Sequence, residues 1–171
     1  MPKRTIKGEL YDKRNGATKK LSDVTTVTYP DIELLTETLK GSGINGEINL
    51  PTIGQIGALE IEVGHNGLSL DIIRTFAMET QHFEHRWASQ VLNRATGASE
   101  VLGKKMIFKG LPKKLGLGSI ESNKAEETST TFECLYLKYV IGNTVALEID
   151  KLNDVFIIDG VDYSAVVRNV L

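Results

Sequence analysis

Strand-forming segments recur along almost the whole chain, and this pattern limits the fold more than any other feature. The segments are rich in Val, Ile, Thr, Phe and Tyr, and several alternate apolar and polar residues with a period of two. Helical spacing is found in two shorter segments, residues 68–80 and 163–171. The sequence therefore predicts a mainly β protein with one or two short helices. The predicted strands lie within residues 23–30, 58–67, 82–92, 104–112, 128–142, 144–153 and 154–163.

Dipeptides typical of tight turns separate several of these segments. Asn66-Gly67 and Asp159-Gly160 are common in hairpins, and Gly142-Asn143 lies between two apolar runs. Tyr29-Pro30 indicates the end of a strand, because proline cannot donate to a sheet ladder. We expect antiparallel strands joined by hairpins.

The first predicted helix has two candidate N-caps, Ser69 and Asp71. Its apolar residues fall at helical spacing on one face, which we expect to lie against a sheet. These residues are Ile72, Ile73, Phe76 and Ala77. Residues 31–40 are ambiguous: Leu34, Leu35 and Leu39 suit a helical face, but Thr36-Glu37-Thr38 suits an extended strand, which we favour.

Length and composition fit one soluble domain spanning residues 1–171. The chain is 41% hydrophobic and 25% charged, and it has no apolar run near the roughly 20 residues that a membrane helix needs. The basic N-terminus has no apolar stretch behind it, so we expect cytosolic synthesis without a membrane span. The single cysteine, Cys134, has apolar and aromatic neighbours and is expected in the core.

Charge is segregated along the chain although the net charge is only −2. Residues 1–20 and 101–114 are basic, whereas residues 146–162 are acidic. Either these are ordinary solvated faces, or patches of opposite sign meet between copies of the protein. We expect residues 1–20 to form a flexible basic arm. The pI of about 5.9 and the scarcity of aromatic residues within the basic runs, one in each, argue against sequence readout of nucleic acid.

The candidates for catalysis and metal binding are weak. His82 and His85 would point to opposite faces of a strand, and we place His65 in a turn. Gly41, Gly43 and Gly46 have the GxGxxG spacing, but no helix can follow them as a dinucleotide site requires. No GxSxG elbow is present. We therefore predict a protein that is not an enzyme and holds no metal or cofactor.

Residues 39–57 form a long segment rich in both glycine and aliphatic residues. Long connections without regular structure are uncommon unless they are functional. We expect an extended, mobile loop that buries its apolar residues on its own core or on another subunit. Its candidate contact residues are Gly41, Gly43, Ile44, Gly46, Ile48, Leu50, Pro51 and Ile53.

Two extended patterns resemble a known family. "VTYPDIELLTETLKGSGINGEINLPTIGQIGALEIEV" and "VALEIDKLNDVFIIDGVDYSAVVRNVL" are similar to the major tail tube protein of contractile-tailed bacteriophages, a family that also builds the inner tube of R-type bacteriocins. The similarity is clear over residues 24–64 and 130–171. Between them it rests on length and strand pattern.

The resemblance implies hexameric rings in which neighbouring subunits complete one β-barrel, stacked into a tube inside a contractile sheath. It implies contacts with sheath, tape-measure, baseplate and terminator proteins, assembly in the bacterial cytoplasm, a place in the virion, and passage of DNA through the lumen. The loop at 39–57 would contact a neighbouring subunit or ring. The C-terminal strand pair and turn would comprise Asp150, Asp154, Asp159, Gly160, Asp162 and Tyr163.

The charges suggest two further expectations. A lumen that passes DNA should not attract phosphates, so inward acids are expected, with Glu33, Glu37, Glu60 and Glu62 as candidates or else as ordinary surface residues. The C-terminal acids are expected to meet either the basic run around Lys104 and Lys105 or the N-terminal arm of an adjacent subunit.

Two other functions remain open from the residues. A secretion-system injection tube would share the ring architecture. A carbohydrate-binding or hydrolytic β-sandwich would need an aromatic platform or paired carboxylates, whereas Trp87 alternates with Phe83 and His85 as expected for packing.

Overall fold

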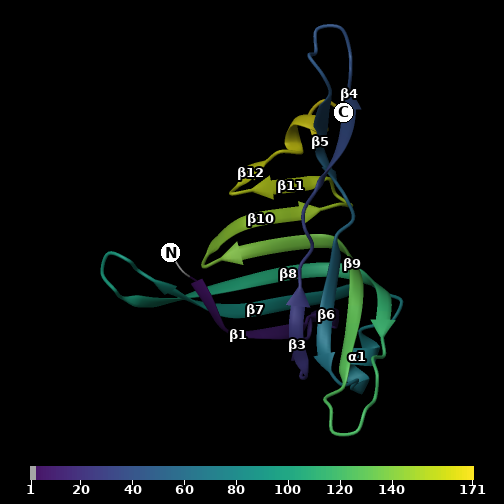
Figure 1. Ribbon diagram of the computed structural model, residues 1–171, viewed down its shortest axis with the longest axis vertical. Helices are drawn as coiled ribbons and strands as arrows, with labels where there is room; N and C mark the ends of the chain where they lie inside the picture. The colour runs from purple at the N-terminus through teal and green to yellow at the C-terminus, as the bar shows by residue number, and fades with distance from the viewer. Residues whose placement is uncertain (1–2) are drawn as a thin grey trace.

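A computed structural model describes residues 3–171, and a long antiparallel sheet forms its body (Figure 1). The predicted mainly β fold is confirmed. The sheet has the strand order β12-β11-β10-β9-β8-β7-β1-β2. These strands are β1 (Lys3–Asp12), β2 (Lys19–Lys20), β7 (Gln81–Leu92), β8 (Ser99–Gly116), β9 (Glu127–Ile141), β10 (Thr144–Asp150), β11 (Val155–Ile158) and β12 (Val161–Asp162).

A second layer covers one face of this sheet. It contains β3 (Val24–Thr28) and β6 (Glu60–Asn66), which pair antiparallel. The first half of β9 pairs with β6, from Glu127 to Glu133, and its second half pairs with β10. β9 therefore belongs to both layers. Its partner β8 shifts register next to Gly110, where the strands bend out of the long sheet.

The core fills the space between the two layers. Phe83 lies 5.2 Å from Phe108 and 5.1 Å from Phe132 between ring centroids, and all three are fully buried. Ile61 of β6 and Cys134 of β9 have no exposed surface. The prediction that Cys134 is a core residue is confirmed.

Two short α-helices and one 3-10 turn complete the body: α1 (Leu70–Arg74), α2 (Ala165–Arg168) and η1 (Arg14–Gly16). Ser69 caps α1, with its Oγ 3.4 Å from the Ile72 backbone nitrogen. Ile72 is fully buried, but Ile73 is 46% exposed. The prediction that four apolar residues share one buried face is therefore wrong, because the helix ends after little more than one turn. Among residues 3–171, no helix has the length and apolar character needed to cross a membrane.

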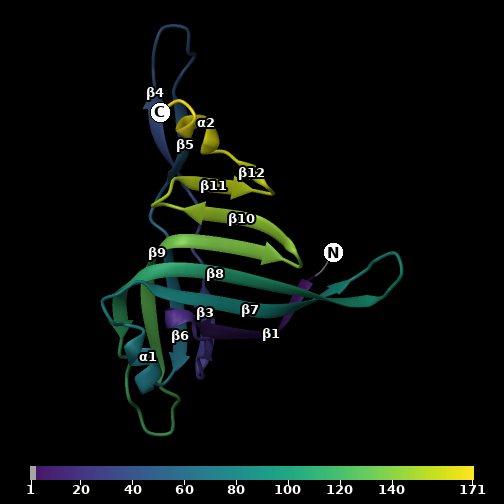
Figure 2. The same ribbon diagram turned by 180° about the vertical axis from the view of Figure 1, so that it is seen from behind.

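The glycine-rich segment is largely a β-hairpin that projects from one end of the molecule (Figures 1 and 2). β4 (Leu34–Leu39) pairs with β5 (Ile48–Ile56) in a separate two-stranded sheet. The preference for a strand within residues 31–40 is confirmed. The prediction of a loop throughout 39–57 is wrong for Ile48–Ile56, because these β-branched and extended residues find a ladder partner in β4.

The basic N-terminus is not a flexible arm over Lys3–Asp12. This segment pairs with β7 from Lys3 opposite Val91 to Asp12 opposite Phe83, and Leu10 anchors it in the core. The expectation of flexibility is therefore wrong there, while residues 1–2 of the predicted arm lie outside the described part of the chain. Burial of Leu10 and the ladder bonds outweigh the high charge of the segment.

The predicted turns have mixed outcomes. Gly142 joins β9 to β10, and Asp159-Gly160 joins β11 to β12 with φ of +47° and +82°, as two-residue hairpin turns require. Asn66-Gly67 does not form a hairpin. The Gly67 nitrogen donates to the Glu126 carbonyl, and the chain continues into α1.

Candidate assembly surfaces

The β4–β5 hairpin exposes more apolar surface than a two-stranded sheet normally carries in water. Leu50 is 52% exposed and Ile53 is 60% exposed. Ile48 faces Leu39 across the ladder, and Leu50 faces Glu37, so Leu39, Ile48 and Leu50 share one face. An exposed apolar face of this kind is a candidate surface for contact with another chain. It includes two of the residues selected from the sequence, Ile48 and Leu50.

The tip of this hairpin is shaped by glycine. Gly43 and Gly46 have φ of +98° and +102°, which other residues adopt only with strain. Lys40 and Glu47 form an ion pair of 2.5 Å where the strands end. Gly41, Ile44 and Pro51 also lie on the hairpin, so the structure brings all of the predicted contact residues together.

The root of the hairpin is fixed to the C-terminal segment. Gly54 lies so close to α2 that an added Cβ would be 2.7 Å from Ser164 Oγ. Lys151 Nζ donates to the Gly57 carbonyl at 2.7 Å, and the Gly57 nitrogen donates to the Glu33 carbonyl at 2.9 Å. The hairpin therefore leaves the body in a defined direction. Gly54 was not singled out from the sequence, because its partner is 110 residues later.

The C-terminal acids have two kinds of local role. Asp150 accepts from the backbone nitrogens of Leu152 and Asn153 at 3.0 and 3.1 Å, which shapes the turn before β11. Asp162 accepts from the Ser164 nitrogen at 3.0 Å and pairs with Arg168, which lowers the pKa of Asp162.

Two further acids lie in the turns themselves. Asp154 has φ of +51° and Asp159 has φ of +47°. Neither forms an ion pair within residues 3–171. Gly160 completes the turn after Asp159, and the Tyr163 side chain is 48% exposed. The predicted C-terminal set therefore lies together around the β10–β11 and β11–β12 turns.

The four candidate lumen acids lie in two separate places. Glu60 and Glu62 point outward from β6, on the side opposite the buried Ile61 and Val63. Glu33 precedes β4 and Glu37 lies on it. Glu60 is paired with Lys113 of β8. None of these acids lies on the uncovered face of the long sheet.

That uncovered face carries rows of charged side chains, with Ile107, Val140 and Ile157 between them. Glu9, Arg86 and Lys105 form one row across β1, β7 and β8. A second row joins Lys138 to Glu148, with a 3.8 Å ion pair between them. The opposite face carries the core residues. Hydrogen bonds from Lys20, Tyr11 and Lys7 lower the pKa of Glu9 to about 2, so this face keeps Glu9 charged in ordinary buffers.

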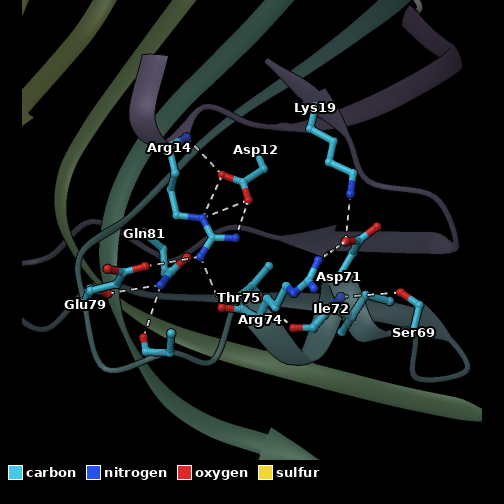
Figure 3. A network of polar contacts seen from close by, with 11 residues as sticks. Asp12, Arg14, Lys19, Ser69, Asp71, Ile72, Arg74, Thr75, Glu79 and Gln81 are labelled. Carbon is cyan, nitrogen blue, oxygen red and sulfur yellow. Dashed lines mark hydrogen bonds and ion pairs between the residues drawn. The ribbon is translucent and has the colours of Figure 1, made fainter. Parts of the chain in front are cut away.

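A polar network fixes α1 to the end of β1 (Figure 3). Arg14 donates to both carboxylate oxygens of Asp12, and its Nη1 donates to the Arg74 carbonyl at 3.1 Å. Lys19 Nζ lies 2.7 Å from Asp71 Oδ1, which lowers the pKa of Asp71. These contacts join segments 52 and 60 residues apart, so no local sequence signal predicts them.

The histidines have structural surroundings. His85 and His82 lie on opposite faces of β7, as predicted, and the Tyr29 hydroxyl is 2.5 Å from His85 Nδ1. His65 does not lie in a turn: it is on β6, is 3% exposed and lies 3.2 Å from Thr130 Oγ1.

Aromatic packing surrounds His85. Trp87 lies 5.0 Å from His85 and stacks on Tyr139 at 5.8 Å between ring centroids. The expected packing role of Trp87 is confirmed. Within residues 3–171, no three metal-ligating side chains come together.

Comparisons with known proteins show what the chain is similar to. A family model described as phage tail tube protein FII matches residues 14–171. A search of curated proteins found no match. A solved chain from the sheath-tube complex of an extracellular contractile injection system, PVC, in its extended state is 15% identical, with a TM-score of 0.51 over 78% of this chain and 87% of that one. A chain from the PVC sheath/tube terminator is also 15% identical, with a TM-score of 0.50 over 78% and 92%.

Proposed function

Because the chain belongs to the phage tail tube protein FII family, it is a structural tail tube protein, and we propose that it forms hexameric rings that stack into the inner tube of a contractile tail. In this role the tube is a passive conduit through which the genome passes when the sheath contracts. The observation that carries the proposal is that the long sheet is open at both edges. β1 pairs with β2 only at Tyr11 and Asp12, which leaves Lys3–Glu9 with a free edge, and the far edge is the two-residue β12.

The two open edges of the sheet, β1 and β12, differ from each other, and this favours head-to-tail contact between subunits. An unpaired strand edge is a template for another chain, and a head-to-tail contact that closes gives a ring. The β1 edge carries Lys3, Arg4 and Lys7, whereas the opposite end of the sheet carries Asp154 and Asp159, besides Asp162 in its pair with Arg168. Opposite charge at the two edges supports this contact. Lys104 and Lys105 are a weaker partner for these acids, because β8 lies inside the sheet.

The apolar hairpin fits the same contact. It projects beyond the β12 end of the sheet, in the direction in which the strands follow one another (Figures 1 and 2). In a ring joined by sheet edges, this direction runs around the circumference. The hairpin would then bury Leu39, Ile48 and Leu50 on the adjacent subunit of the same ring.

The two faces of the sheet suggest which one lines the lumen. The second layer covers the apolar face, and a ring with this layer inside would have its bore filled. We therefore place the polar face inward, with Glu9, Glu148, Arg86 and Lys138 along the lumen. This arrangement competes with the expectation that Glu33, Glu37, Glu60 and Glu62 line it. Labelling of Glu62→Cys from inside or outside the tube would separate the two.

The partners follow from the same role. We propose contact with a sheath on the outside, a tape-measure protein in the lumen during assembly, and baseplate and terminator proteins at the ends. Assembly would occur in the bacterial cytoplasm, and the product would be part of the virion. The likeness of the fold to a contractile injection system keeps a second candidate open, namely the tube of a headless R-type bacteriocin or of a secretion-like injector.

Negative-stain electron microscopy with light scattering tests the proposal. The purified protein should give hollow rings or tubes with six-fold end views at high concentration. The variant in which Lys3, Arg4 and Lys7 are all changed to Glu should lose the rings, whereas Lys104→Glu with Lys105→Glu should keep them. A protein that remains monomeric even with its baseplate as a nucleus would contradict the proposal.

A further inference from the structure

The β7–β8 hairpin projects from the body in a different direction from the β4–β5 hairpin (Figures 1 and 2). It extends along the strands of the long sheet. β1 begins at Lys3 opposite Val91, and β9 ends at Ile141 opposite Lys104. Among residues 3–171, the segment 92–102 therefore extends past both neighbouring strands.

Direction decides what each hairpin can reach in a ring. Strands of a closed barrel are inclined by roughly 35–45° to its axis, so an element that continues the strands leaves the ring at its rim. An element that projects past an edge strand, as the β4–β5 hairpin does beyond β12, instead points around the ring and reaches the adjacent subunit. We propose that the β7–β8 hairpin contacts the next ring of the stack. This inference rests on the ring assembly proposed above.

The hairpin carries unused contact groups. Val101 is 67% exposed and Leu92 is 44% exposed. Val101 faces Gln90 and Leu92 faces Ser99 across the ladder, so both apolar side chains lie on the same face. Arg94 and Glu100 form no ion pair within residues 3–171. The overhang therefore offers one apolar pair and one charge of each sign.

The turn of this hairpin is held in one conformation. Asn93 Oδ1 accepts from the Ala95 nitrogen at 3.0 Å, and the Gly97 nitrogen donates to the Asn93 carbonyl at 2.8 Å. Gly97 has φ of +70°, and Gln90 Nε2 donates to Ser99 Oγ at 2.6 Å. A surface that is ordered before binding loses less conformational entropy on contact.

A recess at the opposite end of the same strands fits the tip. It lies where β1 ends and β7 begins. Because β7 spans 12 residues, or about 40 Å at 3.3 Å per residue, the recess and the hairpin are separated by the length of this strand. The volume of the recess is about 370 Å³. Glu79 pairs with Arg14 at 3.4 Å, but its side chain is 62% exposed, so it can also meet Arg94 of the next ring. Lys109 can meet Glu100. The recess is lined by Lys13, Arg14, Asn15, Gly16, Glu79, Thr80, His82 and Lys109.

The placement explains how rings could stack without limit. Tip and recess lie at opposite rims, so each ring presents tips on one side and recesses on the other. Such a contact between unlike surfaces does not close, and it repeats along an axis.

A double variant tests the inference. Arg94→Glu with Val101→Ser should give rings that remain single, with tube length in micrographs reduced at least about tenfold. The control is Lys124→Glu with Ile120→Ser in the β8–β9 connection, where Ile120 is 86% exposed; it should form tubes of normal length. Normal tubes from the Arg94 variant would overturn the inference while leaving the rings intact. Failure of the unaltered protein to form rings would instead count against the proposed function.

Cross-linking gives an independent measurement, because it leaves the contact residues Arg94 and Val101 unchanged. Thr96→Cys with Asn15→Cys, treated with a short bis-maleimide, should give covalent ladders that extend beyond six copies. Burial raises the pKa of the Cys134 thiol to about 12, so Cys134 should not react. The control pair is Thr96→Cys with Ser42→Cys, which should stay uncross-linked. A ladder that stops at six copies, or no product, would overturn the assignment.

Discussion

In the body of the molecule, Phe83, Phe108 and Phe132 are fully buried between two layers of strands, whereas in the β4–β5 hairpin Leu50 and Ile53 are more than half exposed. Both regions are antiparallel ladders built from strand-forming residues. They differ in what covers them: the body covers its own apolar face, and the hairpin has no second layer. A two-stranded sheet alone is marginally stable in water. The comparison separates residues that maintain the fold from residues available for assembly.

The largest loss of stability is expected in the body. Phe132→Ala should lower the free energy of unfolding by about 3–5 kcal/mol, because it leaves a cavity against Phe83. Urea unfolding monitored by circular dichroism measures this change. Tyr163→Ala, at a side chain 48% exposed, serves as the control and should have a much smaller effect. Equal losses from both would erase the distinction between core and surface.

A smaller loss is expected where the strands bend. At Gly110 an added Cβ would lie 2.6 Å from the Glu133 carbonyl oxygen, so Gly110→Ala should destabilise by about 1–3 kcal/mol. Gly103 on the same strand and Gly41 on the hairpin have open space around them. Their Ala variants should stay within about 0.5 kcal/mol of the original protein. A neutral Gly110→Ala would show that the bend tolerates a side chain.

Acidification should weaken the body through its histidines. Burial lowers the pKa of His65 and of His85 below the ordinary value of 6.5. The unfolded chain therefore binds more protons than the folded one below pH 6.5, and stability falls as the pH drops from 7.5 to 5.5. The slope is at most about 1.4 kcal/mol per pH unit for each histidine. Urea midpoints across this range should drop less in His85→Gln, and a constant midpoint would refute the effect.

The smallest effect on unfolding is expected in the hairpin. Leu50→Ser with Ile53→Ser should change the free energy of unfolding by no more than about 0.5 kcal/mol, because more than half of each residue's surface is already exposed. The same variant should lose rings in electron micrographs. Leu117→Ser, at a side chain 66% exposed, is the matched control and should keep them. Rings that persist in the hairpin variant would remove its proposed role.

Local sequence signals predicted the parts of the fold that depend on neighbouring residues. Strand content, the Asp159-Gly160 turn, the burial of Cys134 and the Ser69 cap all follow from residue type and spacing. The hairpin predicted at Asn66-Gly67 is not formed, because the Gly67 nitrogen donates to the carbonyl of Glu126, far along the chain. The register of each strand pair and the layer that each strand joins depend on contacts between distant segments, so no comparable local signal predicts them.

The assembly surfaces were predictable in part. Apolar residues beside Gly43 and Gly46 marked the hairpin, although its strand pairing was missed. The N-terminal strand was missed because seven basic residues in residues 1–20 suggested a solvated arm. Its strand conformation depends instead on the burial of Leu10 and on pairing with β7. The overhang of β7 and β8 depends on where β1 and β9 stop, which no single segment reveals.

The double membership of β9 has a mechanical consequence. Its first half is bonded to β6 and its second half to β10, so one covalent backbone crosses from the outer layer into the wall of the sheet. In a tube pushed along its axis, strands inclined by roughly 35–45° to that axis would carry part of the force along their length. Ladder bonds then resist together in shear and do not open one after another. Sliding the two layers apart would require stretching the β9 backbone itself, so the wall should transmit thrust as a stiff shell.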